Sequence, residues 1–334
     1  METSTLMAFA QIAGVGSYLP ERRLTNADLE RMVDTSDEWI LKRVGISERR
    51  VVAEGETTSD LGARAGLAAL ADAGVAPEDV DLLVLATSSP DFVFPSTACL
   101  VQAKMGLTCP AFDVMAACTG FIYALQTATD AIVAGRVRTV LVIGADALTR
   151  HVDFTDRSTA VLFGDGAGAV VLTAEDEPGV MCVELGSDGS GADMLKVPVG
   201  AAVPPTSGMC ERGEQYLVME GSEVFKFAVR VIPQVTRKAL SACKLKTDDL
   251  RWLVPHQANQ RIIDTIADRL HMPHEKVVST IRDMGNTSTA SIPLALDGLY
   301  TGGDLTSGDL VALVGFGAGL TWGAAVIRWT KEAR

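Results

Sequence analysis

Short aliphatic stretches alternate along the chain with longer segments in which small and apolar residues recur at helical spacing. Residues 62–74 form such a segment, which is rich in alanine and leucine and ends at a glycine. An acidic turn follows, and then the aliphatic stretch Leu82–Leu85, whose length and composition are typical of a buried strand. Because helical segments and strands alternate in this way, we expect an α/β fold.

The same succession of helix, acidic turn and strand returns in the second part of the chain. The segment 235–243 and the strand-like stretch Trp252–Val254 repeat the first unit with an offset of 170 positions (239 − 69 for two aligned alanines). A second pair of aliphatic stretches, 140–144 and 311–315, gives an offset of 171. Two matches at nearly one offset indicate an internal duplication, and the period is far too long for a solenoid.

We therefore expect two similar α/β halves, residues 1–178 and 179–334. The boundary falls in the polar turn 175–179, which separates two strand-like stretches. A further irregular segment, 201–213, contains two prolines among mixed polar residues and is expected to be a surface loop.

Composition and charge exclude several classes of partner and location for this protein. The 334 residues are 48% hydrophobic, enough for a large core, and 29 Lys and Arg stand against 42 Asp and Glu, a net charge of −13. Broad binding to nucleic acid or to an anionic membrane needs a cationic surface, so neither partner is expected. No apolar run reaches the roughly 18 residues of a membrane span. The first residues lack a secretory pattern, so we expect a cytoplasmic protein.

The cysteines are scattered, and none is spaced as in a metal site. They are Cys99, Cys109, Cys118, Cys182, Cys210 and Cys243. In a long chain without CxxC or CxxH motifs, this distribution indicates reduced thiols rather than disulfides or zinc. We therefore expect neither a disulfide nor a metal site.

Cys118 is the candidate nucleophile. It lies in the small-residue segment 116–120, between a strand-like approach and a helical pattern that extends to Gly135. The unpaired N–H groups and the positive dipole at a helix N-terminus stabilise a thiolate, so we expect a lowered pKa for this thiol. The alternative is inert packing, because cysteine is among the most buried residues.

His256 is the second candidate. It follows the strand-like stretch 253–255, and the C-terminal ends of strands in open α/β sheets are where binding sites form. The duplication aligns it with Ala86, so only the second half has a polar side chain at this place. This asymmetry favours a function over a hydrogen-bonded structural histidine. The other histidines, His151, His271 and His274, lie in polar stretches and are expected to be solvated.

Two further segments are rich in turn-forming residues. Asn286 lies in the segment 283–293, where helix capping and turn formation are the simple explanation. The glycines at 315, 317 and 319 resemble a nucleotide-binding loop, but a strand-like stretch follows them rather than a helix that could receive a pyrophosphate. We therefore expect this turn to place backbone N–H groups near a reacting atom.

In combination and in order along the chain, these residues resemble one known family. Cys118 in Ala-Ala-Cys-Thr-Gly, His256 in His-Gln-Ala-Asn and Asn286 in Gly-Asn-Thr-Ser are similar to motifs of β-ketoacyl-acyl carrier protein synthase III. The segments 37–43, 155–157 and 316–322 extend the resemblance over essentially the whole chain. It implies the thiolase fold, in which two duplicated halves form a five-layered αβαβα sandwich, and a homodimer.

The resemblance also implies a reaction. This is the decarboxylating Claisen condensation of an acyl-CoA primer with malonyl-acyl carrier protein, which initiates fatty acid biosynthesis. Cys118 would carry the acyl group, while His256 and Asn286 would donate hydrogen bonds to the enolate formed from the malonyl group. The backbone N–H groups of Cys118 and Ala318 would form the oxyanion hole. The CoA thioester is a substrate, and no cofactor is implied.

The same resemblance implies residues that bind the substrates. Trp39 and Arg157 would hold the adenine of CoA, with Arg43 near its phosphates, and Phe94 would reach across the homodimer into the partner's acyl pocket. The residues lining the pantetheine tunnel would be Gly221, Phe225, Ala258, Asn259 and Ile262. The docking site for the acidic carrier protein would consist of Lys226, Arg230, Arg261 and Arg269.

Other interpretations of the same residues belong to different classes. A synthase III-like enzyme of secondary metabolism would use another acyl primer or malonyl-CoA, and the motif around Cys118 does not separate it from the first interpretation. A noncatalytic thiolase-fold protein would have lost Cys118, His256 or Asn286, and all three are present. A nucleotide-dependent dehydrogenase would need a glycine loop that opens a helix. The identity of the acyl primer stays open.

Overall fold

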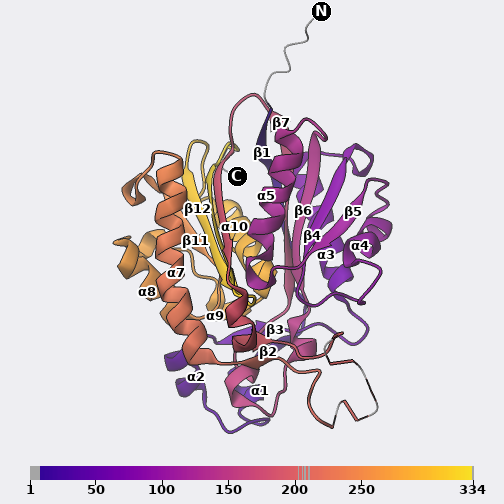
Figure 1. Cartoon of the computed structure of the whole chain (residues 1–334), viewed down its shortest axis with the longest axis vertical. Helices are drawn as coiled ribbons and strands as arrows, with labels where there is room; N and C mark the ends of the chain where they lie inside the picture. Colours follow the sequence, from indigo (N-terminus) through magenta and orange to yellow (C-terminus); the bar gives the residue numbers. More distant parts are fainter. Residues whose placement is uncertain (1–7, 202, 205, 207, 210, 333–334) are drawn as a thin grey trace, which may run out of the picture.

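The computed structural model describes residues 8–201, 203–204, 206, 208–209 and 211–332. Its two main β-sheets stand next to each other in Figure 1. The first consists, in spatial order, of β1 (Phe9–Tyr18), β7 (Gly166–Glu175), β6 (Thr139–Asp146), β4 (Leu82–Ala86) and β5 (Ala111–Val114). The second consists of β8 (Val180–Ser187), β13 (Thr321–Arg328), β12 (Leu310–Gly317) and β11 (Trp252–Pro255).

The two sheets repeat one topology. In the first, β1, β7 and β6 are antiparallel neighbours and β4 runs parallel to β6. In the second, β8, β13 and β12 are antiparallel neighbours and β11 runs parallel to β12. Within the described residues, β5 is an additional edge strand of the first sheet, parallel to β4. The polar turn between β7 and β8 is the place where the chain passes from one sheet to the other.

The two parallel strands β4 and β11 are also reached in the same way. The helix α3 (Thr58–Ala73) leads through the single-turn 3-10 helix η1 (Pro77–Asp79) to β4. The helix α7 (Gly221–Ala242) leads through η5 (Thr247–Asp249) to β11. These are the two units whose similarity predicted the duplication, and the structure shows the same order of elements in both.

Helices separate the two sheets and cover their outer faces (Figure 1). The helices α5 (Gly120–Val133) and α10 (Ser291–Thr301) contact both sheets and form the central layer. On the outer face of the first sheet lie α3 and α4 (Thr97–Met105), and on that of the second lies α7 with α8 (Gln260–Leu270) packed against it. The expected αβαβα sandwich is therefore confirmed.

The central helices explain why the halves form one body. A helix covered on both faces must be apolar nearly all round. Phe121, Ile122 and Leu125 of α5 and Ile292 and Leu296 of α10 are all fully buried. They belong to one hydrophobic cluster with residues of both sheets, so the junction between the halves is part of the core.

Shorter elements complete the chain. Those at the lower end of Figure 1 are β2 (Arg23–Thr25), α1 (Asn26–Leu29), α2 (Asp37–Val44), β3 (Glu48–Arg50) and α9 (Ile281–Met284). Elsewhere lie α6 (Arg157–Ala160) and the paired strands β9 (Leu195–Lys196) and β10 (Val218–Met219). The remaining 3-10 helices are η2 (Ala117–Thr119), η3 (Leu148–His151), η4 (Gly189–Met194), η6 (His274–Lys276) and η7 (Ser288–Ala290). The described positions of 201–213 contain no helix or strand.

The cysteine distribution led to one wrong expectation. Cys182 on β8 and Cys243, which caps α7, form a disulfide, although the sequence predicted reduced thiols. They are 61 residues apart in the chain, so no local sequence motif indicates that they pair. The packing of α7 across β8 brings the end of the helix against the strand. Cys99, Cys109 and Cys118 are free, and Cys210 lies outside the described residues.

Among the residues that the structure describes, no helix combines the length and the apolarity that a transmembrane span requires.

Candidate active site

Cys118 lies where the first half meets the second. It sits in η2, immediately before α5 begins at Gly120, so its expected place near a helix N-terminus is found. The side chain is buried, with 7% of the residue exposed. Ala117, which precedes it, has a φ of 45°, in the left-handed region that non-glycine residues rarely adopt. The backbone is therefore held in an unusual conformation next to the candidate nucleophile.

The electrostatic surroundings of Cys118 contradict the expectation of a lowered pKa. Burial is the largest effect and raises the pKa of the thiol to about 12, while a hydrogen bond from the Ser288 hydroxyl lowers it. The negative charge of Asp146 raises the pKa further. Loss of solvation is thus the dominant effect on this thiol, which is protonated at neutral pH.

His256 comes from the second half, directly after β11. Its backbone N–H donates to the Val314 carbonyl at 2.7 Å, and its Nδ1 lies 2.7 Å from the Ser291 hydroxyl. The ring of Phe316 packs edge-on against the imidazole at 5.5 Å between ring centroids. Burial lowers the pKa of His256 to about 3, so the ring is neutral. Its Nε2 has no hydrogen-bond partner among the described residues.

Asn286 is held between α9 and η7. Its backbone N–H donates to the Leu162 carbonyl at 2.9 Å, and its side-chain Oδ1 accepts from the backbone N–H of Ser288, also at 2.9 Å. Because Oδ1 is engaged, the orientation of the amide is fixed. Its Nδ2 donates to no other described residue, although the side chain is buried. Asn286 thus presents a free N–H donor, as His256 presents a free ring nitrogen.

The glycine turn after β12 lies directly against Cys118. A Cβ atom at Gly317 would be only 2.7 Å from the backbone nitrogen of Cys118, so only glycine allows this approach. The Thr321 hydroxyl lies 3.0 Å from both the Ala116 and the Ala318 carbonyl oxygens and so connects the turn with the cysteine loop. Gly317, the residue before Ala318, therefore lies against the backbone of Cys118, where the expected oxyanion hole would form.

The expected adenine-binding pair is already in contact. The guanidinium of Arg157 lies over the ring of Trp39, at 4.9 Å from the centroid, and donates to the Asp34 carbonyl at 3.0 Å. Both side chains are exposed. To hold a flat base between them, the guanidinium and the indole ring would have to be separated by about twice the stacking distance of about 3.5 Å. The two side chains therefore have to separate before they can hold an adenine.

The residues expected around the pantetheine tunnel lie at the beginnings of two adjacent helices. Gly221 and Phe225 are in the first turns of α7, and Ile262 is in the first turn of α8. Asn259 caps α8, and Ala258 precedes it. The side-chain amide of Asn259 lies 3.5 Å from the carbonyl oxygen of Arg43, so α2 is joined to this group of residues.

The residues expected to dock the carrier protein occupy α7 and α8. Arg261 is exposed and lies over the ring of Phe225, with 5.6 Å between the guanidinium carbon and the centroid. Lys226 forms an ion pair with Glu223 at 2.7 Å. Arg269 donates to the Val229 carbonyl at 2.8 Å, whereas Arg230 is exposed without a direct ion pair among the described residues. Of these four cations, Arg261 contacts an expected tunnel residue, Phe225.

Phe94 belongs to an exposed apolar patch beside the edge strand β5. Its exposed fraction is 84%, and the patch also contains Phe92, Val93, Phe112 and Met115. Asp113 of β5 accepts hydrogen bonds from the first N–H groups of α4, so the strand is joined to the helix that follows the Phe94 loop. The structure thus leaves Phe94 free to contact another molecule.

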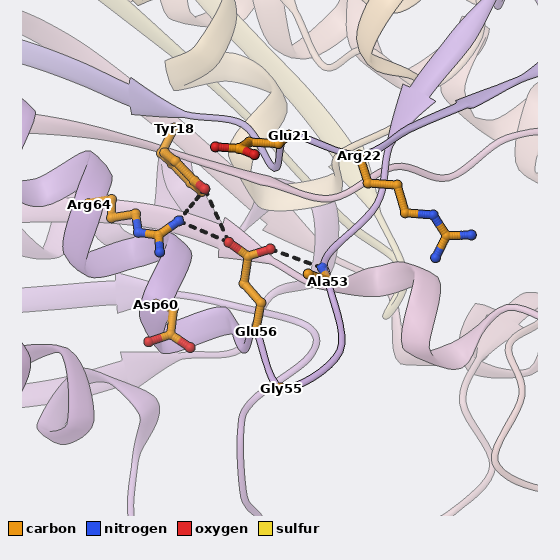
Figure 2. Close-up of a pocket in the computed structure, with 8 residues that line it drawn as sticks. All are labelled: Tyr18, Glu21, Arg22, Ala53, Gly55, Glu56, Asp60 and Arg64. Carbon is orange, nitrogen blue, oxygen red and sulfur yellow. Dashed lines mark hydrogen bonds and ion pairs between the residues drawn. The ribbon is translucent and has the colours of Figure 1, made fainter.

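A hollow of about 730 Å³ lies away from all these residues (Figure 2). Tyr18, Glu21, Arg22 and Arg64 are among its lining residues, and Glu56 accepts hydrogen bonds from Arg64 at 3.0 Å and from the backbone of Ala53 at 3.0 Å. Arg64 and Glu56 form an ion pair at its wall, and none of the expected site residues lines it.

Sequence reasoning did not single out three side chains that contact the candidate site. Ser288 touches the Cys118 thiol, Ser291 touches His256, and Asp146 acts on Cys118 through its charge. The first two lie in a segment in which turn formation seemed a sufficient explanation. A signal for Asp146 was its position as a carboxylate ending a strand-like stretch, directly before an apolar segment.

The two halves form a duplicated five-layered sandwich, and a buried cysteine of one half lies at the junction with a neutral histidine and an asparagine of the other. These features define the class: a condensing enzyme of the thiolase fold. The models of 3-Oxoacyl-[acyl-carrier-protein (ACP)] synthase III and of its C-terminal part match residues 112–189 and 240–329. The β-ketoacyl-[acyl-carrier-protein] synthases III of Xanthomonas campestris and Xylella fastidiosa are each 52% identical to this chain over 322 residues, covering 96% of it and 98% of each relative. The chain belongs to the β-ketoacyl-[acyl-carrier-protein] synthase III family.

Solved structures agree with this assignment. The crystal structure of the Pseudomonas aeruginosa 3-oxoacyl-(acyl carrier protein) synthase III superposes with a TM-score of 0.90 at 44% identity, covering 98% of this chain and all of the other. The priming β-ketosynthase of the R1128 polyketide pathway superposes with a TM-score of 0.91 at 38% identity, covering 97% of each chain. The thiolase fold is confirmed, and the protein is an acyltransferase that performs a condensation.

Proposed function

We propose that Cys118, His256 and Asn286 carry out the decarboxylating condensation of an acyl-CoA primer with malonyl-acyl carrier protein, the first condensation of fatty acid biosynthesis. One observation carries this proposal. Within the part of the chain that the structure describes, His256 and Asn286 each keep one nitrogen without a hydrogen-bond partner, near the place where η7 and β12 contact the η2 turn that carries Cys118.

In the loading step, the Cys118 sulfur attacks the thioester carbonyl of acyl-CoA. The negative oxygen of the tetrahedral intermediate accepts hydrogen bonds from the backbone N–H groups of Cys118 and Ala318. When the carbon–sulfur bond to CoA breaks, CoA leaves as a thiol and takes up the proton that Cys118 has lost. Because the thiol begins protonated, loading requires this proton transfer in addition to the attack.

In the condensation step, the malonyl group loses CO₂ and the electrons of the broken bond form a thioester enolate. His256 Nε2 and Asn286 Nδ2 donate hydrogen bonds to the enolate oxygen. The Ser291 hydroxyl can donate to Nδ1, which places the ring proton on Nε2, where it is needed. The enolate carbon then attacks the acyl group on Cys118, and the sulfur leaves and recovers a proton. No step consumes a cofactor.

The test of this function is intact-mass measurement after incubation with a panel of acyl-CoAs, followed by addition of malonyl-acyl carrier protein. An acyl adduct on Cys118 that disappears as product forms is expected, and its mass identifies the primer. Cys118→Ala must show neither adduct nor product. His256→Ala is expected to load normally and to lose decarboxylation by about 10²–10³-fold. An acylated Cys118→Ala protein that still condenses would disprove the assignment of the nucleophile.

A priming role outside fatty acid synthesis is the second candidate function. Its support is the likeness to the R1128 priming β-ketosynthase, at 38% identity over 97% of both chains. The identities of 52% to the β-ketoacyl-[acyl-carrier-protein] synthases III favour fatty acid synthesis. The primer found on Cys118 in the acyl-CoA panel separates the two functions.

We also propose that the CoA and carrier substrates enter over the starts of α7 and α8, and that Arg261 helps to dock the carrier. We further propose that the enzyme is a cytoplasmic homodimer. Arg261 is exposed beside Phe225, and an acidic partner needs local positive charge on a body whose net charge is −13. The apolar patch around Phe94 supports the homodimer, because an edge strand with exposed large side chains needs a cover.

The docking proposal is tested with Arg261→Glu. We expect slower condensation with the carrier substrate, through a higher KM, and unchanged loading from acyl-CoA. Arg136→Glu is the matched control, because Arg136 is exposed beyond the end of α5 and the change in net charge is the same. Equal losses in both half-reactions, or equal effects of the two variants, would contradict a docking role for Arg261.

A further inference from the structure

Asp146 is a fully buried carboxylate at the junction of the halves, and the mechanism above gives it no role. It is the last residue of β6. Its Oδ1 accepts hydrogen bonds from the Thr87 hydroxyl at 3.1 Å and from the backbone N–H of Ser88 at 2.7 Å. Ser89 adds its N–H at 3.0 Å and its hydroxyl at 2.8 Å. The Oδ2 atom accepts from the N–H of Thr289 at 3.0 Å and from its hydroxyl at 2.8 Å.

These hydrogen bonds divide between the two halves of the protein. Residues 87–89 follow β4 of the first half, whereas Thr289 lies in η7 of the second. Both oxygens accept from backbone N–H groups, which can only donate, and this is the pattern that an ionised carboxylate satisfies. No lysine or arginine among the described residues forms an ion pair with Asp146, so its charge is balanced by oriented N–H and O–H groups.

Thr289 connects this carboxylate to the reacting groups. The preceding residue, Ser288, has a φ of 50°, donates its N–H to Asn286 Oδ1 and places its hydroxyl against the Cys118 thiol. A Cβ atom at Gly144 would lie 2.4 Å from the Thr289 carbonyl oxygen, so η7 rests directly on β6. A displacement of Thr289 would therefore be passed to both Asn286 and Ser288.

We propose that Asp146 is a positioning residue for the condensation: its carboxylate holds η7 of the second half against the ends of β4 and β6 and thereby places Asn286 and Ser288 around Cys118. The inference rests on the proposed function, because condensation is the step in which Asn286 takes part. Loading needs Cys118 and the glycine turn, and within the described residues Asp146 forms its hydrogen bonds with other segments.

The charge of Asp146 gives a readout that does not depend on substrate. It raises the pKa of Cys118, whereas the Ser288 hydroxyl lowers it. The other titratable groups on the surrounding elements are His256 after β11, Tyr123 on α5 and Asp165 before β7. Removal of the Asp146 charge is therefore expected to move the pH profile of Cys118 alkylation to lower pH.

Asp146→Asn is the first test. An amide has one oxygen and one NH₂ group, so its NH₂ must face either the 87–89 N–H groups or the Thr289 N–H, and one of the two loops has to move. We expect kcat for condensation to fall by about 10²-fold with a smaller change in loading, since a misplacement of about 1 Å costs a factor of this size. The alkylation profile should shift to lower pH in the same protein.

Asp165→Asn is the matched control. Asp165 is also fully buried and accepts three hydrogen bonds, from the N–H and hydroxyl of Thr149 and from the N–H of Val52, but none comes from the second half. This variant should keep the wild-type ratio of condensation to loading and the wild-type alkylation profile. If Asp165→Asn changes both as much as Asp146→Asn does, or if Asp146→Asn leaves both unchanged, the proposal is wrong.

Thr289→Val and Thr289→Ser provide a second test in case Asp146→Asn does not fold. Valine retains the shape but loses the hydroxyl that donates to Asp146, and serine restores that hydroxyl. We expect condensation to fall about tenfold in the valine variant and to recover in the serine variant. Equal condensation rates in the two would overturn the proposal. If the wild-type protein never forms acyl-Cys118, the proposed function fails, while the alkylation profiles still report the coupling of Asp146 to Cys118.

Discussion

Cys118 and His256 are both buried, and burial shifts their pKa values in opposite directions. It raises the pKa of the thiol to about 12 and lowers the pKa of the imidazole to about 3. At neutral pH both groups are therefore uncharged, rather than forming a thiolate–imidazolium pair. A neutral imidazole suits the donation of a hydrogen bond to an enolate. A neutral thiol means that loading depends on removal of a proton after the substrate has arrived.

This charge state predicts how Cys118 reacts with iodoacetamide. We expect the alkylation rate to keep rising between about pH 7 and pH 10, because a thiol whose pKa is about 12 gains thiolate throughout this range. Intact-mass measurement over time gives the rate, and Cys118→Ala gives the contribution of the other cysteines. A plateau below pH 8 would show that the helix end outweighs burial, as the sequence led us to expect.

Single residues also show what could be predicted from the sequence at this scale. Cys118, His256 and Asn286 were identified because each lies in a recognisable short motif. Asp146 and Ser288 were not, because their roles depend on partners far along the chain: Thr289 is 143 residues from Asp146, and Ser88 is 200 residues from Ser288. The expectation of a lowered pKa for Cys118 was wrong for a related reason. Local sequence shows the start of a helix, but it does not show the burial that later segments of the chain cause.

At the scale of elements, the contact between the glycine turn and the η2 turn decides the shape of the proposed oxyanion hole. The turn after β12 belongs to one half and η2 to the other, and Gly317 is the residue at which they touch. The sequence indicated a turn that presents N–H groups, because a strand and not a helix follows the glycines. It could not indicate which segment of the other half the turn would meet.

Gly317→Ala tests this contact. The added methyl would lie 2.7 Å from the Cys118 nitrogen, so one of the two backbones must move, and we expect acyl loading to slow by about 10²-fold or more. Gly298→Ala in α10 is the control, because a Cβ there meets nothing within 4 Å. In a helix interior this control should stabilise the protein by roughly 0.5–1 kcal/mol with unchanged loading. Wild-type loading in Gly317→Ala would refute the close approach.

The disulfide is the second feature of this scale with a measurable effect. It joins Cys182 on β8 to Cys243 at the end of α7 and closes a segment of 61 residues. In the chain-entropy description, Cys243→Ser should lower the free energy of unfolding of the oxidised protein by about 4 kcal/mol. Urea unfolding measures this difference, and a reductant should abolish it. If thiol titration of the unreduced, unfolded protein gives the same number of thiols as after reduction, the bond is absent in solution.

At the scale of the whole molecule, the apolar patch beside β5 distinguishes the first half from the second. The patch contains Phe92, Val93, Phe94, Phe112 and Met115, and it lies where the first sheet has its additional edge strand. An uncovered edge with large apolar side chains favours association with a second copy. Within the described residues, the corresponding edge of the second sheet is formed by β11.

Met115→Lys is expected to weaken the proposed homodimer. Met115 is 74% exposed in the isolated chain, and a buried lysine at its place would leave a charge without a partner. Light scattering after size-exclusion chromatography should show a dimer for the wild-type protein and a monomer for the variant. Val133→Lys, at an exposed apolar residue that ends α5, should remain dimeric. A monomeric wild-type protein would contradict the proposal outright.

The overall architecture was the most predictable level of organisation. Two matched units at nearly one offset indicated the duplication, and the motif combination indicated the thiolase fold, because both depend on patterns that repeat or recur in order. The disulfide could not be predicted, since the packing of α7 on β8 alone brings its cysteines together. The contact between Trp39 and Arg157, which closes the expected adenine site, is likewise visible only in three dimensions.

The junction between the two halves has a consequence for how the protein loses activity. The proposed nucleophile Cys118 lies in one half, whereas His256, Asn286 and the glycine turn lie in the other. A small displacement of one half relative to the other would therefore inactivate the enzyme while each sheet remains folded. Mild heat or denaturant should abolish turnover before the global unfolding transition begins, which makes turnover a more sensitive gauge of correct assembly than any spectroscopic signal of secondary structure.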